Sequence, residues 1–430
     1  MHEREIDVSS GSFAIGWRQV ASGFVLLACV ATITSSYSVI VVPIASEFKP
    51  SRAVMGLAMT AISGVSAILA PFLGTLMDRI SLRSMMVTGA LLLSAGFAAL
   101  TLAHSFTQIL IAYAVLIAPA NVLIGPVAVT VLLSRWFVNR RGAALGIAIA
   151  GVAMGGVVFP PIIQGLFDNF AWREAMRYYA LLILVLTVAA AVLVVNKPAE
   201  KGLHPDGAAF DPVKAAGIKP PLSVREILTD PAFWLIVIMV AVVTSGMKGM
   251  VTNLAPLAID QGISPTTAAW LVTAYASMGF ISKLSFAFVA DRINLRYLAV
   301  VSLFGFGLGM LGMTQAQLGF WAIAAAVGLI GLFGGMMVPL ESMLGARVFG
   351  RDAVGRAVGL LSMVLLIFLM STPPLFGFIF DQTGSYAGIF YVFGALAILM
   401  TLVVPYVRMQ ARDVVEDEAA TAAATVQAAA

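Results

Sequence analysis

Apolar segments of about 20 residues alternate with short polar segments along almost the whole chain. A run of this length crosses the hydrocarbon core of a bilayer as a helix, and a helix satisfies its own backbone hydrogen bonds there. The pattern therefore predicts an all-α integral membrane protein with twelve transmembrane helices. The predicted spans are residues 18–45, 53–76, 84–103, 107–134, 142–167, 175–195, 231–259, 265–289, 297–315, 318–346, 354–380 and 386–407.

One long polar insert, residues 196–230, separates two sets of six spans. We expect it to be a cytoplasmic linker between an N-terminal six-helix bundle, residues 18–195, and a C-terminal six-helix bundle, residues 231–407. Residues 1–17 form a polar cytoplasmic N-terminus. Residues 408–430 are first acidic and then rich in Ala and Thr, and we expect them to form a disordered cytoplasmic tail.

The two sets of six spans carry the same residues at a fixed spacing. Gly74–Arg83 closes the second span, Ala287–Arg296 closes the eighth, and both contain Asp-Arg-Ile-x-Leu-Arg. The spacing from Asp78 to Asp291, which we call the repeat spacing, also relates Pro43 to Pro256, Ser51 to Ser264, Pro126 to Pro339, Gly146 to Gly359, Pro160 and Pro161 to Pro373 and Pro374, and Phe167 and Asp168 to Phe380 and Asp381. Because six is an even number of spans, the two halves form a parallel, pseudo-symmetric repeat. Two such halves around a midplane site indicate alternating access.

Composition and charge agree with a membrane location. Hydrophobic residues make up 60% of the chain and charged residues 11%, whereas a soluble domain carries about 25% charged residues. The net charge is only +4 and the basic residues lie in short loops, so nucleic-acid binding is not expected. The single cysteine, Cys29, excludes an intramolecular disulfide and a cysteine-based metal site.

The basic residues are distributed unevenly between the two sides of the predicted membrane. With the N-terminus in the cytoplasm, 19 of the 25 Lys and Arg fall on the cytoplasmic side and four fall on the outer side. The outer four are Lys49, Arg52, Arg173 and Arg177. Cytoplasmic loops carry an excess of Lys and Arg, so we expect both termini to be cytoplasmic.

The loop sequence Gly-x-Leu-x-Asp-Arg-x-x-x-Arg at residues 74–83 resembles the loop 2–3 signature of the major facilitator superfamily, with Ser81 where a glycine is usual. The resemblance extends from Trp17 to Arg408. Within the superfamily, the following stretches resemble the monocarboxylate and oxalate/formate branch: Tyr37–Phe48, Arg135–Arg141, Ala143–Gly151 and Phe380–Tyr386. The resemblance implies two six-helix bundles around a central cavity.

The resemblance also implies a latch that holds the two halves together when the inner side is closed. Its residues would be Asp78, Arg79, Arg83, Asp291, Arg292 and Arg296. A carboxylate at such a helix end interacts favourably with the N-terminus of a neighbouring helix. The alternative is that the arginines only anchor the helices on the cytoplasmic side.

Small residues and prolines in the fifth span allow two interpretations. Gly146, Gly151 and Gly155 let helix backbones approach closely, and Pro160 and Pro161 follow them. We expect the prolines to end or kink the helix, which would make this span and the eleventh gating elements. Tight packing without a gating role is the alternative.

Two lysines lie inside predicted spans. Lys248 is near the middle of the seventh span, where a charged side chain costs at least about 2.5 kcal/mol, so we expect it to face a watery cavity and bind an anion. A buried pair with Glu341 is the alternative. Lys283, in the eighth span, occupies what resembles the position of the carboxylate-binding Arg of the monocarboxylate branch, with Gly279 where that branch has an Asp. It is therefore expected to bind substrate or, alternatively, to extend toward the inner surface.

Three other residues complete the candidate site. Glu341, near the inner end of the tenth span, is a candidate for carrying a coupled proton, although it could also pair with a lysine or face inner water. Asn121 and Tyr37 are candidate hydrogen-bond donors to substrate, because spans 1, 4, 7 and 10 line the cavity in the resembling family. Either residue could instead bond a neighbouring helix.

The sequence thus indicates secondary active transport of a small organic anion, a mono- or dicarboxylate, by proton-coupled symport or anion exchange. A drug or amphipath efflux pump of the same fold is the alternative. A membrane receptor would not need both Asp-Arg loops, and the sequence has no Walker A motif, metal cluster or nucleophile triad, so neither an enzyme nor a cofactor is expected. The expected partners are the anion, protons and the lipid bilayer. We expect a monomeric functional unit in the plasma (bacterial inner) membrane.

Overall fold

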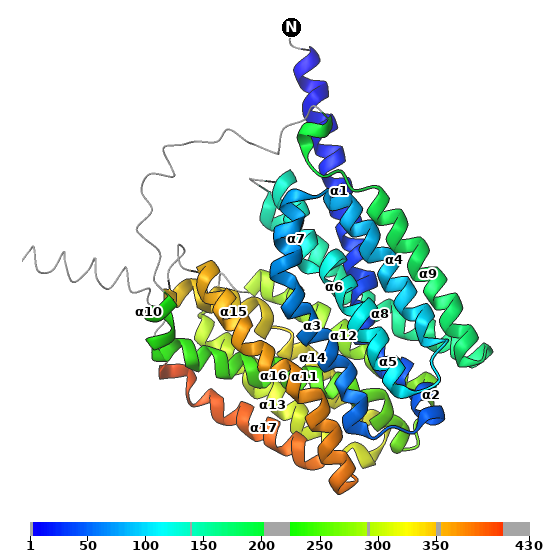
Figure 1. The fold of residues 1–430 in the computed structure, drawn as a ribbon. Coiled ribbons are helices and arrows are strands. Elements are labelled where there is room, and N and C mark those ends of the chain that lie inside the picture. The colour runs from blue at the N-terminus through cyan, green and yellow to red at the C-terminus, as the bar shows by residue number, and fades with distance from the viewer. Residues whose placement is uncertain (1–2, 138–139, 202–223, 290–292, 350–353, 407–430) are drawn as a thin grey trace, which may run out of the picture. The chain divides into compact units, whose positions relative to one another are not determined.

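The computed structural model describes residues 3–137, 140–201, 224–289, 293–349 and 354–406, and these residues are predominantly helical (Figure 1). The predicted all-α class is confirmed. The first half contains α1 (Glu3–Ser35), α2 (Tyr37–Phe48), α3 (Arg52–Arg79), α4 (Leu82–Leu100), α5 (Phe106–Ala112), α6 (Ala118–Ile124), α7 (Pro126–Trp136), α8 (Arg141–Asn169) and α9 (Trp172–Val192). The second contains α10 (Val224–Thr229), α11 (Pro231–Asp260), α12 (Pro265–Val289), α13 (Leu295–Met313), α14 (Phe320–Gly334), α15 (Met337–Phe349), α16 (Val354–Thr383) and α17 (Ala387–Thr401).

Among the described residues, ten helical segments are long and apolar enough to cross a membrane. They match ten of the twelve predicted spans. The eighth predicted span falls on α12, and the twelfth falls on the shorter helix α17. The chain is therefore a multi-pass membrane protein.

Three predicted spans consist of more than one helix. The first is divided between α1 and α2 at Ser36, and the tenth between α14 and α15 after Gly334. The fourth is divided into α5, a short π-helical segment (Tyr113–Ile117), α6 and α7. Pro126 starts α7, because proline lacks the N–H that a continuous helix would need there and suits the first helical position.

The two double prolines do not interrupt their helices. α8 continues through Pro160 and Pro161, and α16 continues through Pro373 and Pro374. The helices therefore do not end at these prolines, and the kink that was the other expectation stays a prediction. Neighbouring helices can compensate for a missing backbone hydrogen bond inside a membrane protein.

The chain forms two compact units, and the first consists of Met1–Phe210, Gly249–Phe280 and Met370–Tyr386. In this unit, α8 packs on α1 through Gly151 and Gly155. A Cβ atom on either glycine would overlap the backbone of α1 at Phe24 or Ala28. These glycines therefore permit close packing of α8 on α1, which was one of the two interpretations of the glycines in the fifth span. Helix α4 packs on α9, where the hydroxyl of Ser94 donates to the carbonyl of Ala180 at 2.7 Å.

The second unit consists of Asp211–Lys248, Ile281–Leu369 and Ala387–Ala430, and α13 packs there on α14 and α17. Gly309 of α13 faces Ile330 of α14, and Gly307 faces Gly394 of α17. Both ends of α13 lie one repeat spacing after the corresponding ends of α4, and so does its N-cap, Asn294, relative to Ser81. The sequence repeat is thus also a repeat of helix boundaries.

Candidate functional site

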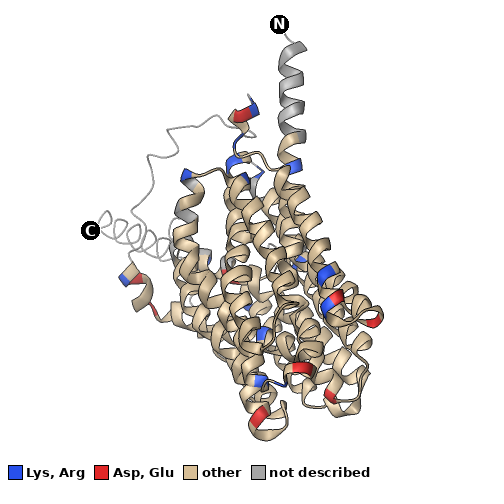
Figure 2. Cartoon of the chain, turned by 45° about the vertical axis from the view of Figure 1, so that its right-hand side comes forward, with Lys and Arg blue, Asp and Glu red and all other residues tan. Residues whose placement is uncertain are grey.

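Charged side chains lie mainly near helix ends, and few lie along the helices (Figure 2). Arg79 ends α3, whereas Arg83 and Arg296 lie in the first turns of α4 and α13, and all three are exposed. The side chain of Asp78 and the whole of Asp291 and Arg292 lie outside the described part of the chain. The predicted latch between the Asp-Arg loops therefore stays a prediction.

Lys248, Lys283 and Glu341 all belong to the second unit and are half-buried. Lys248 lies in the middle of α11, Lys283 lies in the last third of α12, and Glu341 lies in the second turn of α15. Lys283 and Glu341 have neither a hydrogen bond nor an ion pair within the described ranges. The alternative of a Lys248–Glu341 ion pair is thus not observed in this structure.

The junction between α14 and α15 brings the helices of these three residues together. A Cβ on Gly334 would lie 2.6 Å from the sulfur of Met247, the residue before Lys248. A Cβ on Gly335 would lie 2.9 Å from Ser282, the residue before Lys283. A side chain at Gly335 would press on Ser282 of α12, whereas at Gly334 the flexible end of Met247 could move aside.

Ser282 adds an unusual polar group beside this junction. Its side chain is fully buried, and its hydroxyl has no hydrogen-bond partner among the described residues. A buried polar group without a partner costs about 1–3 kcal/mol, so such groups are uncommon in folded proteins. Ser282 thus places a buried polar group beside the junction between α14 and α15.

Asn121 and Tyr37 belong to the first unit, and both bond neighbouring helices. The amide of Asn121 donates to the hydroxyl of Ser66 on α3 at 3.1 Å. Tyr37 is only 2% exposed, its hydroxyl donates to the carbonyl of Met55 on α3, and its ring packs edge-on against Tyr113. Both residues thus bond a neighbouring helix, which was the alternative to substrate binding. Of the two, Tyr37 is buried and Asn121 is half-buried.

In the first unit, one face of α3 lies along one face of α16. Gly56 is so close to α16 that a Cβ there would lie 2.5 Å from the nitrogen of Pro374. One turn further along, the hydroxyl of Thr60 donates to the carbonyl of Met370. A Cβ on Gly64 would lie 2.7 Å from the terminal methyl of Met370. Residues four apart share a face, so these contacts form a continuous line, which we call the α3–α16 seam.

The repeat generates a matching contact between α12 and α8, which we call the α12–α8 seam. The hydroxyl of Thr273 on α12 donates to the carbonyl of Val157 on α8 at 3.2 Å. Thr273 lies one repeat spacing after Thr60, and Val157 lies one repeat spacing before Met370. The two hydrogen bonds are therefore related by the repeat, with the roles of the halves exchanged.

Both seams end in an aspartate at a helix N-terminus. The carboxylate of Asp381 on α16 accepts hydrogen bonds from the backbone N–H groups of Arg52 and Ala53, each at 2.9 Å. Asp168 on α8, the repeat partner of Asp381, accepts a hydrogen bond from the hydroxyl of Thr266 in the first turn of α12 at 3.0 Å. A carboxylate interacts favourably with the positive end of a helix dipole. In each half, the fifth span thus places an aspartate at the N-terminus of the second span of the other half: α8 contacts α12, and α16 contacts α3.

Sequence reasoning noted the repeated aspartates but gave them no role. The available signal was the repeat spacing, which also relates the serines that precede α3 and α12, Ser51 and Ser264. The partner of each aspartate depends on how α8 and α16 cross the other half. That crossing is a tertiary feature that helix periodicity does not contain.

Two ion pairs also lie at helix ends, and the first involves Arg52, which Asp381 contacts as well. Arg52 binds Asp260 at the end of α11, and Arg173 binds Glu47 at the end of α2 through two nitrogens, at 2.5 and 2.7 Å. The indole of Trp172 donates to Glu47 as well, at 2.7 Å. Exposed pairs of this kind contribute little to stability, because water screens them. Within the described ranges, no group of three or more His, Cys, Asp or Glu residues is placed to hold a metal ion.

Comparison with known proteins places these features in a family. The family described as Major Facilitator Superfamily matches residues 23–258 and 238–428. Monocarboxylate transporter 12 of Mus musculus is 24% identical over 422 residues, which cover 92% of this chain and 86% of that protein. Monocarboxylate transporter 13 of Bos taurus is 26% identical over 385 residues, covering 88% and 86%. Monocarboxylate transporter 11 of Homo sapiens is 32% identical over 274 residues, covering 61% and 56%. The resemblance to the monocarboxylate branch is confirmed.

Proposed function

The chain belongs to the Major Facilitator Superfamily, and on this premise we propose that it carries a small organic anion, a mono- or dicarboxylate, by alternating access. Membership of this family makes the chain a transporter rather than an enzyme. The relatives in the comparison are named as monocarboxylate transporters, which supports a carboxylate as the cargo. The efflux of amphipathic cations has no support from these relatives.

The observation that carries the proposal is the arrangement of Lys248, Lys283 and Glu341 on helices that meet at Gly334 and Gly335. Charged side chains inside a membrane are costly and serve function by default. Two positive groups against one negative group favour an anion, and we propose that the two lysines bind its carboxylate. Glu341 is the proposed carrier of a coupled proton. Asn121 remains a proposed polar contact for the substrate, whereas the hydroxyl of Tyr37 is already bonded to Met55.

The proposed transport cycle uses the two seams as the gate at one membrane face. When the α3–α16 and α12–α8 seams separate, that end opens, and the Asp-Arg loops at the opposite ends of α3 and α12 close as the latch. We place both termini and the linker, residues 196–230, in the cytoplasm, because 19 of the 25 Lys and Arg then lie on that side. The seam ends then face outward from the plasma (bacterial inner) membrane. The two six-helix bundles, residues 18–195 and 231–407, are the proposed moving bodies of a monomeric functional unit.

Uptake into proteoliposomes tests the proposal. We expect the wild-type protein to take up at least one radiolabelled acid from a panel of mono-, di- and aromatic carboxylates, and to leave an amphipathic cation outside. If Glu341 carries a proton, an inward proton gradient accelerates uptake, and Glu341→Gln removes that acceleration. Stimulation by internal acid instead would assign anion exchange. Folded protein that carries the cation and none of the acids would refute the proposal.

A further inference from the structure

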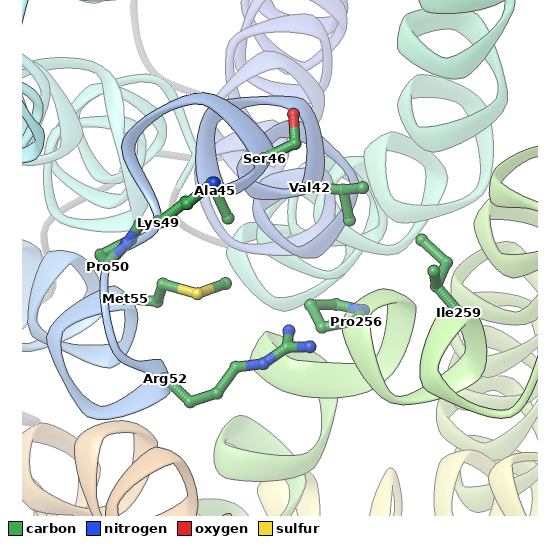
Figure 3. Close-up of a pocket in the computed structure, with 9 residues that line it drawn as sticks. All are labelled: Val42, Ala45, Ser46, Lys49, Pro50, Arg52, Met55, Pro256 and Ile259. Carbon is green, nitrogen blue, oxygen red and sulfur yellow. The ribbon is translucent and has the colours of Figure 1, made fainter. Parts of the chain in front are cut away.

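A cavity of about 340 Å³ lies in the first unit, where α2 ends and α3 begins (Figure 3). Its volume is at the lower end of the range of small-molecule pockets. Met55 and Pro256 contribute apolar walls, and Lys49 and Arg52 contribute positive charge. Lys248, Lys283 and Glu341 are not among the residues that line it.

Lys49 lies at the cavity wall, where it ends helix α2. Lys49 is the one non-glycine residue with a positive φ in the described part of the chain, at 47°. This left-handed conformation ends α2, as it ends many helices, and the backbone N–H of Lys49 donates to the carbonyl of Ala45 there. The lysine ammonium has neither a hydrogen bond nor an ion pair among the described residues. The cavity wall thus carries an exposed lysine whose ammonium bonds no other side chain among the described residues.

Arg52 retains unused hydrogen-bond donors. One guanidinium nitrogen, Nη2, donates to both carboxylate oxygens of Asp260, at 2.8 and 2.9 Å. Nη1 and Nε have no acceptor within the described ranges. Figure 3 shows the guanidinium extending from α3 toward Pro256 of α11. A guanidinium carries five N–H groups in a planar fork that matches a carboxylate, so its free edge can bind a second one.

We propose that this cavity is an outer anion site, which receives a small carboxylate between the ammonium of Lys49 and the free edge of Arg52. The inference rests on the proposed function, because it assigns the transported acid as the ligand. Lys49 and Arg52 are the charged residues among the nine that line the cavity, whereas Asp260 and Asp381, which both bond Arg52, do not line it. The apolar walls provide contacts for the carbon chain of the acid. The site binds the anion at the closed outer end, before the seams open.

Protection of an introduced cysteine tests the outer anion site directly. The only native cysteine, Cys29, is buried, so Ala45→Cys at the cavity wall provides a single reactive thiol for a membrane-impermeant maleimide. Acids of the uptake panel are expected to slow its labelling in the full-length protein. Adding Lys49→Gln should raise the half-protecting concentration about fivefold, as expected for loss of one partly exposed charge pair.

Two control variants separate this site from the other basic residues. Arg177→Gln removes an exposed charge at the same end of the helices but outside the cavity, and it should leave protection unchanged. Lys248→Ala should also leave protection unchanged, because Lys248 does not line the cavity. Uptake of an acid without protection of Ala45→Cys overturns the outer site while the proposed function stands. Protection without any uptake supports the outer site and refutes the proposed function. An equal effect of Lys49→Gln and Arg177→Gln also overturns the site.

Discussion

Replacing Lys248 by alanine is expected to lower the kcat/KM of carboxylate uptake about 100-fold. Truncating one partner of a buried, hydrogen-bonded charge pair costs about 2–5 kcal/mol, and each 1.4 kcal/mol is a factor of ten. Lys248 lies in the middle of α11 and its side chain is half-buried, so water replaces the lost contact poorly. Initial uptake rates in proteoliposomes, normalised to folded protein, measure the effect.

Two further variants distinguish loss of charge from general damage. Lys248→Arg keeps the positive charge and should retain more than a tenth of the wild-type activity. Lys197→Ala removes an exposed lysine of the linker and should have no effect. If Lys248→Ala transports the acid normally, Lys248 does not bind the substrate and the proposed site is wrong.

Replacing Gly377 by valine is expected to reduce transport about 100-fold by preventing closure of the α3–α16 seam. A Cβ at this position would overlap the backbone of Arg52 and Ala53, and backbone atoms cannot turn away as a flexible side chain can. Overpacking costs about 1–3 kcal/mol, which at its upper end disfavours the closed state about 100-fold. The helices themselves tolerate the change, because the clash exists only while the seam is closed.

The same helix supplies a matched control for this prediction. Gly359 also lies in α16, and a Cβ there would meet no atom within 4 Å, so Gly359→Val should transport normally. A cysteine at Ala53, at the end of the seam, reports closure through maleimide labelling. We expect its labelling to rise strongly in Gly377→Val and to stay unchanged in Gly359→Val. Equal transport by the two valine variants would show that the seam has no gating role.

The helices and the repeat could be predicted because both depend on local patterns. Apolar run length locates the spans, and the repeat spacing relates equivalent positions such as Thr60 and Thr273, which the structure places in equivalent hydrogen bonds. Pro160 and Pro161 were expected to end or kink their helix, and the structure shows that α8 does not end there. Proline lacks an N–H wherever it occurs, but whether a helix ends there depends on the neighbouring helices, which the sequence alone does not reveal.

The contacts between helices were the least predictable part of the site. Tyr37 has the residue type of a substrate donor, yet its hydroxyl bonds Met55, because α2 and α3 meet at that position. The sequence shows Asp168 and Asp381 only as acids near helix ends. Their partners follow from the way α8 and α16 cross the helices of the other half. Polar residues in membrane helices serve both substrate binding and helix packing, and only tertiary structure separates these uses.

Counterflow tests most directly whether the protein is an anion carrier that works by alternating access. Proteoliposomes are loaded with a high concentration of unlabelled acid and diluted into a trace amount of the same acid in labelled form. A carrier whose site faces one side at a time exchanges the two, so the labelled acid should accumulate transiently above its external concentration and then decline. Equilibration without this overshoot, by folded protein, would contradict alternating access, and no counterflow with any carboxylate would contradict the assignment of the substrate.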